Sequence, residues 1–251
     1  MKKMLSLFRR CVEDYEMIAQ GDRIAVGLSG GKDSLALLSV LAEMRRFYPY
    51  KYEVCAITLD MGFPEADFSP LAEFCKKIDV EFILVKTDIA QIIFDERKEK
   101  NPCSLCANMR RGALSNAAKD NGCNKLALGH HFDDVVNTFM MSLLYEGNLS
   151  CFSPVTYLSK SDITVIRPLI YVPESHIKGF ASHMSLPVCK NPCKADGVTK
   201  RAEVATLINN LRKENKDIKA KLFGALCRSG IAGYKEPQIG KRRKFFTEEE
   251  Q

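Results

Sequence analysis

Short apolar runs alternate along the chain with longer segments in which apolar residues recur at helical spacing. The runs predict five strands, at residues 23–28, 53–59, 81–85, 125–128 and 164–169. The helical spacing predicts helices at residues 4–19, 34–47, 107–118, 135–145 and 204–211. Strands that alternate with helices and read as near-continuous apolar runs are typical of parallel sheets covered on both faces. The pattern predicts an α/β fold: an open, mostly parallel five-stranded sheet flanked by helices, with helical N- and C-terminal additions.

Length and composition indicate a folded protein with a substantial core. The chain has 251 residues, of which 46% are hydrophobic, and this excludes a disordered or fibrous protein. It contains no run of about 18 apolar residues, and its first residues lack the apolar stretch and cleavage site of a secretory signal. We therefore expect a cytoplasmic protein that does not enter a membrane.

Positive charge is concentrated toward the C-terminus. The net charge of +6 is mild, but residues 200–221 contain seven basic and three acidic side chains, and a Lys-Arg-Arg-Lys run occupies residues 241–244. This distribution is consistent with RNA binding, whereas a solvated helix face is the alternative. The candidates for phosphate contacts are Lys200, Arg201, Arg212, Lys213 and the 241–244 run.

A glycine-containing loop follows the first predicted strand, which ends at Leu28. Its sequence is Ser29-Gly30-Gly31-Lys32-Asp33-Ser34, and a predicted helix begins at its end. The glycines permit a tight turn close to a ligand, and the free N–H groups of a helix N-terminus attract an anion. The glycine-to-lysine spacing is shorter than in a Walker A loop, so kinase-type transfer of a terminal phosphoryl group is disfavoured.

A second polar segment follows the fourth predicted strand. It reads Gly129-His130-His131-Phe132-Asp133-Asp134. Gly129 allows close approach of the backbone, and Asp133 and Asp134 are able to hold Mg²⁺ near a phosphate. The alternative is an acidic N-cap for the next helix. Because the carboxyl ends of parallel strands share one edge of a sheet, both segments are expected at one ligand site.

Four of the ten cysteines form two groups. They are Cys103-Ser104-Leu105-Cys106 and Cys189-Lys190-Asn191-Pro192-Cys193. Four convergent thiolates would suit structural zinc, whereas three would leave an iron of an iron–sulfur cluster open to sulfide or substrate. The first pair alone would suit a redox dithiol. The spacing leaves these three options open.

The glycine loop resembles the PP-loop of the N-type ATP pyrophosphatases, which form adenylated intermediates and release pyrophosphate. The resemblance implies that residues 28–34 hold the pyrophosphate portion of ATP and that Asp33 helps to place Mg²⁺. It also implies that the adenine lies at the end of the second strand, beside Thr58 and Leu59. By the same resemblance, Gly129, Asp133 and Asp134 lie near the α-phosphate.

Further segments resemble the tRNA 2-thiocytidine synthetase (TtcA) family over nearly the whole chain. They are residues 13–18 and 21–26, the Cys-Ser-Leu-Cys group followed by Met-Arg-Arg-Gly at 109–112, the segment 129–134, residues 165–169, and Cys193 with Arg201 eight residues later. The resemblance implies that Cys103, Cys106 and Cys193 hold a 4Fe-4S cluster, with Cys189 as the alternative third ligand. It also implies that Arg110 stabilises developing charge or binds phosphate.

This family resemblance implies an ATP-dependent tRNA sulfurtransferase. ATP adenylates a carbonyl oxygen of a base, and sulfur then displaces AMP; sulfide on the open iron is the implied nucleophile, and a cysteine persulfide is the alternative. The implied partners are tRNA, a sulfur donor such as a cysteine desulfurase or free sulfide, and a second copy of the chain. Two other classes stay open: a ligase or amidotransferase of the lysidine synthetase type, and a non-catalytic, zinc-stabilised protein that binds ATP and RNA.

We expect three regions along the chain. Residues 1–22 are predicted to form an N-terminal helix, and residues 23–172 the PP-loop ATP pyrophosphatase domain, including the Cys-Ser-Leu-Cys group. Residues 173–251 are predicted to form a C-terminal helical region with the third cluster cysteine and the basic tail.

Overall fold

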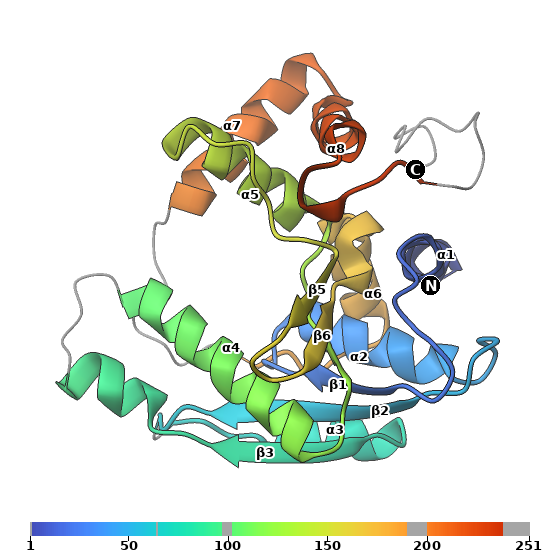
Figure 1. Ribbon diagram of the computed structural model, residues 1–251, viewed down its shortest axis with the longest axis vertical. Coiled ribbons are helices and arrows are strands. Elements are labelled where there is room, and N and C mark those ends of the chain that lie inside the picture. The colour runs from blue at the N-terminus through green and yellow to red at the C-terminus, as the bar shows by residue number, and fades with distance from the viewer. Residues whose placement is uncertain (1, 64, 97–101, 190–199, 238–251) are drawn as a thin grey trace.

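The fold is built on one six-stranded sheet with the strand order β3-β2-β1-β4-β6-β5 (Figure 1). The computed structural model describes residues 2–63, 65–96, 102–189 and 200–237. The strands are β1 (Arg23–Gly27), β2 (Glu53–Asp60), β3 (Glu81–Lys86), β4 (Lys125–Ala127), β5 (Val155–Leu158) and β6 (Ile163–Ile166). All neighbouring strands pair in parallel except β5, which runs antiparallel to β6. The predicted α/β class with a mostly parallel sheet is confirmed.

The prediction of five strands missed β5 at the edge of the sheet. This strand has only four residues, and Val155 and Tyr157 point outward, with Tyr157 62% exposed. An edge strand with one solvated face gives no continuous apolar run, which is the signal that revealed the other five. The strand predicted at 164–169 ends at Ile166, because a 3₁₀ turn begins at Pro168, which has no N–H to donate to a ladder.

The helices surround the sheet in the order expected for crossover connections. They are α1 (Lys2–Asp14), α2 (Lys32–Met44), α3 (Ser69–Lys77), α4 (Pro102–Asp120), α5 (Phe132–Tyr145), α6 (Glu174–His183), α7 (Lys200–Glu214) and α8 (Ile218–Ser229), with the short turns η1 (Gln91–Glu96), η2 (Pro168–Tyr171) and η3 (Ile231–Gly233). Helix α4 begins at Pro102, five residues before the predicted start at 107. Proline is favoured in the first turn of a helix, so Cys103 and Cys106 lie within α4, and the prediction that they precede it was wrong.

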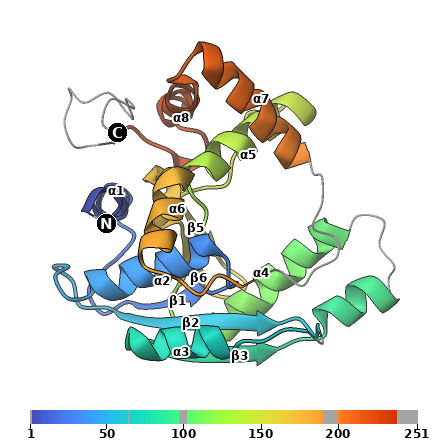
Figure 2. The ribbon, with the colours of Figure 1, turned by 180° about the vertical axis from the view of Figure 1, so that it is seen from behind.

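The two faces of the sheet have separate cores. Along β1, Ile24 and Val26 pack with α1, α2 and α5, whereas Ala25 packs with Leu126 and with Ala118 of α4. Figures 1 and 2 show the same division, with α4 alone across one face and α2, α3 and α6 on the other. This division arises because successive side chains of a strand point to opposite faces of the sheet. The carboxyl ends of the strands therefore lie between α2 on one face and α4 on the other.

The C-terminal helices belong to the larger core. The ring of Phe223 in α8 lies 5.0 Å from that of Phe132, 5.9 Å from Tyr171 and 6.0 Å from Tyr234, measured between centroids. Side chains from α1 to Tyr234 form one contiguous hydrophobic cluster. The division into three regions therefore stays a prediction. None of the helices in the described part of the chain has the length and apolar character needed to cross a membrane.

Replacement of Phe223 tests whether α8 stabilises the whole fold. Phe223 is 1% exposed, so Phe223→Ala removes buried aromatic surface and leaves a cavity. We expect the free energy of unfolding to fall by about 3–5 kcal/mol in urea denaturation. The control is Phe47→Ala, which removes a 46% exposed ring after α2 and should cost less than about 0.5 kcal/mol. Equal effects of the two variants would contradict the packing described here.

Candidate active site at the carboxyl ends of the strands

The phosphate-binding loop is shaped by glycine and serine. Gly30 has a φ of +79°, in the region that favours glycine, and α2 begins at Lys32 with no side-chain cap on its first N–H groups. The Ser34 hydroxyl donates to the Gly31 carbonyl oxygen at 2.9 Å and accepts from the Ser29 N–H at 3.2 Å. The serines thus hold the turn open while the uncapped N–H groups of α2 remain available to an anion.

A cavity of about 660 Å³ lies beside this loop. Its wall includes seven of the predicted ATP contacts together with the predicted catalytic arginine: Leu28, Ser29, Gly31, Ser34, Thr58, Leu59, Gly129 and Arg110. Asp33, which was predicted to place Mg²⁺, also lines it, whereas Gly30, Lys32, Asp133 and Asp134 are not on its wall. The hydroxyl of Thr58 donates to the Leu28 carbonyl oxygen at 2.8 Å and joins the ends of β1 and β2. The structure therefore brings the two predicted segments and α4 to one cavity.

Gly129 makes the closest approach between the two segments. A Cβ atom added at this position would lie 3.1 Å from the backbone nitrogen of Ser34 and 3.1 Å from the carbonyl carbon of Asp33. Neither backbone atom is able to move away without displacing the start of α2. Glycine suits this position because any larger residue would have to push the two turns apart by a few tenths of an ångström.

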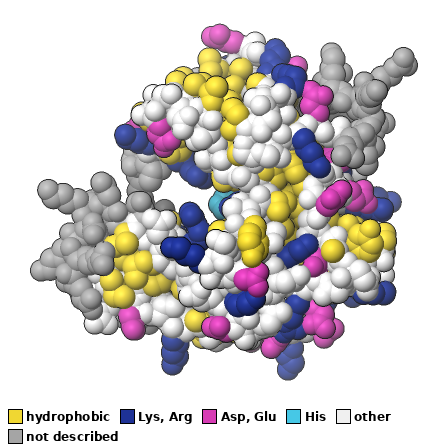
Figure 3. Space-filling model, in the orientation of Figure 1, with side chains coloured by type: hydrophobic (Ala, Val, Ile, Leu, Met, Phe, Trp, Pro, Cys, Tyr) yellow, Lys and Arg dark blue, Asp and Glu magenta, His cyan; other side chains and the backbone are white. Residues whose placement is uncertain are grey.

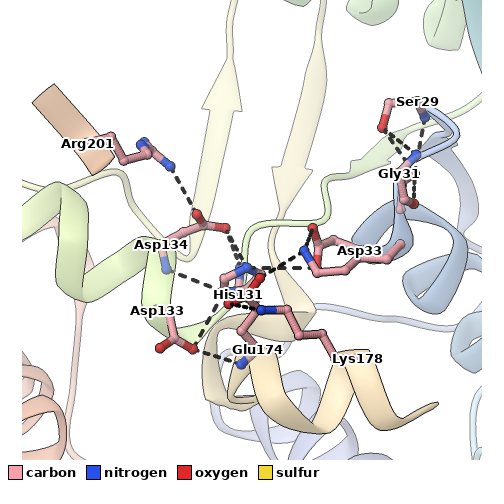
Figure 4. Close-up of polar contacts among 11 residues, drawn as sticks. Ser29, Gly31, Asp33, His131, Asp133, Asp134, Glu174, Lys178 and Arg201 are labelled. Carbon is pink, nitrogen blue, oxygen red and sulfur yellow. Dashed lines mark hydrogen bonds and ion pairs between the residues drawn. The ribbon is translucent and has the colours of Figure 1, made fainter. Parts of the chain in front are cut away.

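His131 connects the acidic segment to the phosphate loop (Figure 4). It caps α5: its Nδ1 accepts from the Asp134 N–H at 3.4 Å, and the Asp134 carboxylate accepts from the His131 N–H at 3.1 Å. Since Nδ1 is an acceptor, the proton of the neutral ring lies on Nε2. Nε2 is 3.5 Å from Asp134 Oδ2 and 3.8 Å from Asp33 Oδ1. The capping role of His131 was not predicted from the sequence, although a polar residue before an acidic first turn is the usual capping signal.

The two aspartates at the start of α5 also bind the C-terminal helices. Arg201 of α7 donates to Asp134 Oδ1 at 3.0 Å. Lys219 of α8 donates to Asp133 Oδ1 at 2.8 Å, and the N–H of Glu174 in α6 donates to Asp133 Oδ2 at 2.7 Å. Burial raises the pKa of Asp133, but the hydrogen bonds from Lys219 and Glu174 outweigh it and keep the pKa below its ordinary value. The sequence offered no signal for Lys219 or Glu174.

Asp33 has the features of a cation ligand. Its Oδ2 is 3.0 Å from the Lys32 ammonium, which is also 3.0 Å from Glu174. Burial lowers the pKa of Lys32, but Asp33 and Glu174 outweigh it and raise the pKa above its usual value. The other oxygen, Oδ1, is buried and accepts no hydrogen bond from any described residue. A buried anionic oxygen at the mouth of a phosphate loop suits Mg²⁺, which binds carboxylates and phosphates together.

The cysteine groups are only partly described. Cys106 lies in α4, one turn before Arg110, which lines the cavity. The N–H of Cys189 donates to the Gly30 carbonyl oxygen at 3.0 Å, so Cys189 lies against the phosphate loop, and burial followed by the charge of Asp67 raises the pKa of its thiol. Cys193 and the side chain of Cys103 lie outside the described residues. Within the described residues, no three His, Cys, Asp or Glu side chains form a metal-binding group.

Basic residues predicted to bind RNA lie on α7, and other basic side chains gather around the hollow in Figure 3. The ammonium of Lys200 lies 4.9 Å from the centroid of the Tyr145 ring, and Arg201 is engaged with Asp134. The 241–244 run is outside the described residues. RNA binding by these side chains stays a prediction.

Comparisons with known proteins agree with this geometry. Residues 3–211 match the model of the PP-loop domain family. The chain is 40% identical over 228 residues to the tRNA-cytidine(32) 2-sulfurtransferase of Geobacter sulfurreducens, covering 90% of this chain and 89% of that protein. It is 38% identical over 227 residues to the protein of the same name from Legionella pneumophila, covering 90% and 80%. Among solved structures, it is similar to the U34-tRNA thiolase NcsA from Methanococcus maripaludis with its [4Fe-4S] cluster, with a TM-score of 0.75, 26% identity and coverage of 94% and 84%.

The bond between Lys219 and Asp133 predicts a pH-dependent loss of stability in Lys219→Met. At pH 7 we expect the free energy of unfolding to fall by about 1.5–3 kcal/mol, because a charge-assisted hydrogen bond is lost. The folded-state pKa of Asp133 lies below its unfolded value, so the contribution is present above about pH 3.9 and disappears as the pH falls through the folded pKa.

The two unfolding curves should therefore converge in acid. The control Lys221→Met changes an exposed lysine of the same helix, whose ammonium donates to the uncharged Asn215 Oδ1 at 3.1 Å, and it should have little effect at any pH. A difference between Lys219→Met and wild type that stayed constant down to pH 2.5 would contradict this account.

Proposed function

Because this chain belongs to the PP-loop family, we propose that it uses ATP to replace a carbonyl oxygen of a tRNA base by sulfur, with cytidine 32 as the target. The observation that carries the proposal is the convergence of three segments on one cavity. The phosphate loop supplies Ser29 and Asp33, the turn after β4 supplies Gly129, and α4 supplies Arg110. The tRNA sulfurtransferases at 38–40% identity favour this reaction over the ligase, amidotransferase and non-catalytic alternatives.

ATP binds first, with its phosphates at the start of α2. The N–H groups and hydroxyls of residues 29–34 face the phosphates, and Asp33 Oδ1, which accepts no hydrogen bond from the described residues, would hold Mg²⁺. Thr58 and Leu59 line the cavity at the end of β2, where backbone groups meet the adenine. The Lys32 ammonium, which contacts Asp33 and Glu174 at 3.0 Å each, adds positive charge beside the phosphate loop.

Adenylation makes the base oxygen a leaving group. The carbonyl oxygen attacks the α-phosphorus, the bond from the α-phosphorus to the bridging oxygen breaks, and pyrophosphate leaves. A sulfur nucleophile then adds to the same carbon, and the carbon–oxygen bond breaks to release AMP with the original oxygen. Arg110 stabilises negative charge on the phosphate during both steps, because its guanidinium lines the cavity and is exposed there.

We assign Asp133 and Asp134 positioning roles and not direct contact with the reacting groups. Both were predicted as catalytic, and their carboxylates are engaged by Lys219 and by Arg201 and His131. Asp134 orients His131, whose Nε2 lies 3.8 Å from the proposed Mg²⁺ ligand Asp33. Asp133 fixes the start of α6 beside the loop. These contacts favour positioning of Asp33 and of the turn at Gly129 over direct binding of the metal.

A 4Fe-4S cluster held by Cys103, Cys106 and Cys193 is the proposed source of sulfur reactivity. Three thiolates leave one iron able to carry the sulfur that enters the base. Cys103 and Cys106 are three residues apart in α4, and the next turn of that helix carries Arg110 to the cavity, so this pair would hold a cluster beside the substrate. Cys189 is the alternative third ligand: it lines the same cavity as Arg110, and its N–H donates to the Gly30 carbonyl oxygen at the phosphate loop.

The remaining partners follow from the reaction. A cysteine desulfurase or free sulfide supplies the sulfur, tRNA is the acceptor, and the reaction takes place in the cytoplasm, where tRNA is modified. A homodimer is the proposed assembly.

The reaction is tested by formation of 2-thiocytidine in tRNA with ATP, Mg²⁺ and sulfide, measured by mass spectrometry of nucleosides. Asp33→Asn keeps the size of the side chain and removes the charge that holds Mg²⁺, so pyrophosphate release in the presence of tRNA should fall at least about 100-fold. The control is Asp162→Asn in the turn before β6, at the opposite edge of the sheet, which should react like wild type. Absence of any thiolated nucleoside with the reconstituted wild-type protein would refute the proposed function.

The ligand set is tested by iron content and the visible absorption of anaerobically reconstituted protein. Cys193→Ser should lose the cluster, whereas Cys189→Ser should retain iron and sulfide at the wild-type ratio. Cys227→Ser, a change at a buried cysteine of α8, controls for the general effect of the substitution. Loss of the cluster in Cys189→Ser with retention in Cys193→Ser would reverse the assignment.

A further inference from the structure

An aromatic stack borders the cavity and has no part in the chemistry proposed above. The rings of His130 and Phe152 lie 4.8 Å apart between centroids, with an angle of 36° between their planes. The guanidinium carbon of Arg167 lies 5.2 Å from the centroid of Phe152. Histidine, phenylalanine and arginine thus form a small stack of planar groups from two turns and a strand end.

Hydrogen bonds and core packing hold Arg167 and Phe152, the two members of the stack behind His130, in place. Arg167 is buried and donates to the Ser153 carbonyl oxygen at 2.6 Å and to the Thr156 hydroxyl at 3.2 Å. These bonds connect it to the residues on either side of Pro154, at the start of the β5–β6 hairpin. Phe152 is half-buried against the larger core. The ring of His130 therefore rests on a fixed support.

Of the three side chains in the stack, only His130 reaches the cavity. His130 lines it together with Asp33, Arg110 and Arg111, whereas Phe152 and Arg167 do not. Its neighbour Gly129 touches the backbone of the phosphate loop, so the histidine ring lies close to where the phosphates of ATP are proposed to bind.

The charge state of His130 suits contact with an uncharged ring. Burial, and then the positive charge of Arg167, lower the pKa of His130 to about 4, so the imidazole is neutral near pH 7. The other titratable groups that act on it are Asp134, Arg201 and His131. Its Nδ1 is buried and has no hydrogen-bond partner among the described residues. A structural hydrogen bond through this atom therefore does not account for a histidine at this position.

We propose that the His130–Phe152 stack is the platform on which the target pyrimidine of tRNA lies while its carbonyl oxygen is adenylated. Bases that undergo chemistry leave their own stack, and aromatic side chains commonly replace the lost neighbours. Arg110 and Arg111, exposed on α4, flank this platform with the charge that a nucleotide's phosphates require. The inference rests on the proposed function and adds to it the residues that receive the base. The competing occupant is the adenine of ATP, which we place at Thr58 and Leu59 instead.

The test compares Phe152→Leu with Phe152→Tyr. Leucine fills similar space without a ring, so packing is kept while the support of the stack is lost; tyrosine keeps the ring. We expect kcat/KM for thiolation of tRNA to fall about 10-fold or more in Phe152→Leu and to stay within about 3-fold of wild type in Phe152→Tyr. The Kd for ATP should be unchanged in both. Phe47→Leu, which changes an exposed ring after α2, is the matched control and should react like wild type.

A spectroscopic measurement separates stacking from a general structural effect. A tRNA with the fluorescent base pyrrolocytosine at position 32 is bound without ATP, so no reaction occurs. Stacking quenches this base, so the bound probe should be at least about two-fold brighter on Phe152→Leu and on His130→Ala than on wild type, and His130→Phe should restore the quenching.

Three results would overturn the inference: wild-type kcat/KM in Phe152→Leu, equal probe fluorescence on all variants, or a weaker Kd for ATP in Phe152→Leu, which would place the adenine on the stack. Failure of the wild-type protein to form 2-thiocytidine is a different result, because it would refute the proposed function itself.

Discussion

The close approach of two strand-to-helix turns is the constraint on which the site depends. β1 and β4 are parallel neighbours, with Val26 opposite Ala127, so the turns that follow them leave the same edge of the sheet. Gly129 then brings its backbone against Asp33 and Ser34, so closely that a Cβ atom would force the two turns to move apart. This contact places His130, which follows Gly129, and the phosphate loop at one cavity, whose wall also includes Arg110 of α4.

The same contact explains why the C-terminal helices matter for a site formed mostly by the sheet. Lys219 and Arg201 bind the aspartates at the start of α5, and His131, which caps that helix, lies 3.8 Å from Asp33. Movement of α7 or α8 would therefore change the geometry at the proposed Mg²⁺ ligand. Because α7 also carries basic side chains, tRNA that contacts this helix would act on the same network.

Sequence patterns predicted the parallel sheet and the two polar segments because those features are local. A buried strand, a glycine turn and a helix start each leave a signal within a few residues, as at Ser29 to Ser34. The edge strand β5 was missed because its exposed face removes that signal, and α4 begins earlier than its apolar spacing suggests because Pro102 and the cysteine group extend it. Lys219 and the His130–Phe152 stack were not predictable, since their partners meet only through tertiary packing.

Transfer of the base oxygen to AMP is the most direct test of the central claim that the cavity adenylates a base before sulfur enters. A tRNA labelled with ¹⁸O at O2 of cytidine 32 is thiolated by the reconstituted protein, and the AMP formed is analysed by mass spectrometry. The account predicts one ¹⁸O atom in the phosphate of AMP for each sulfur introduced. Thiolation with unlabelled AMP would show that the oxygen leaves by another route and would contradict the account.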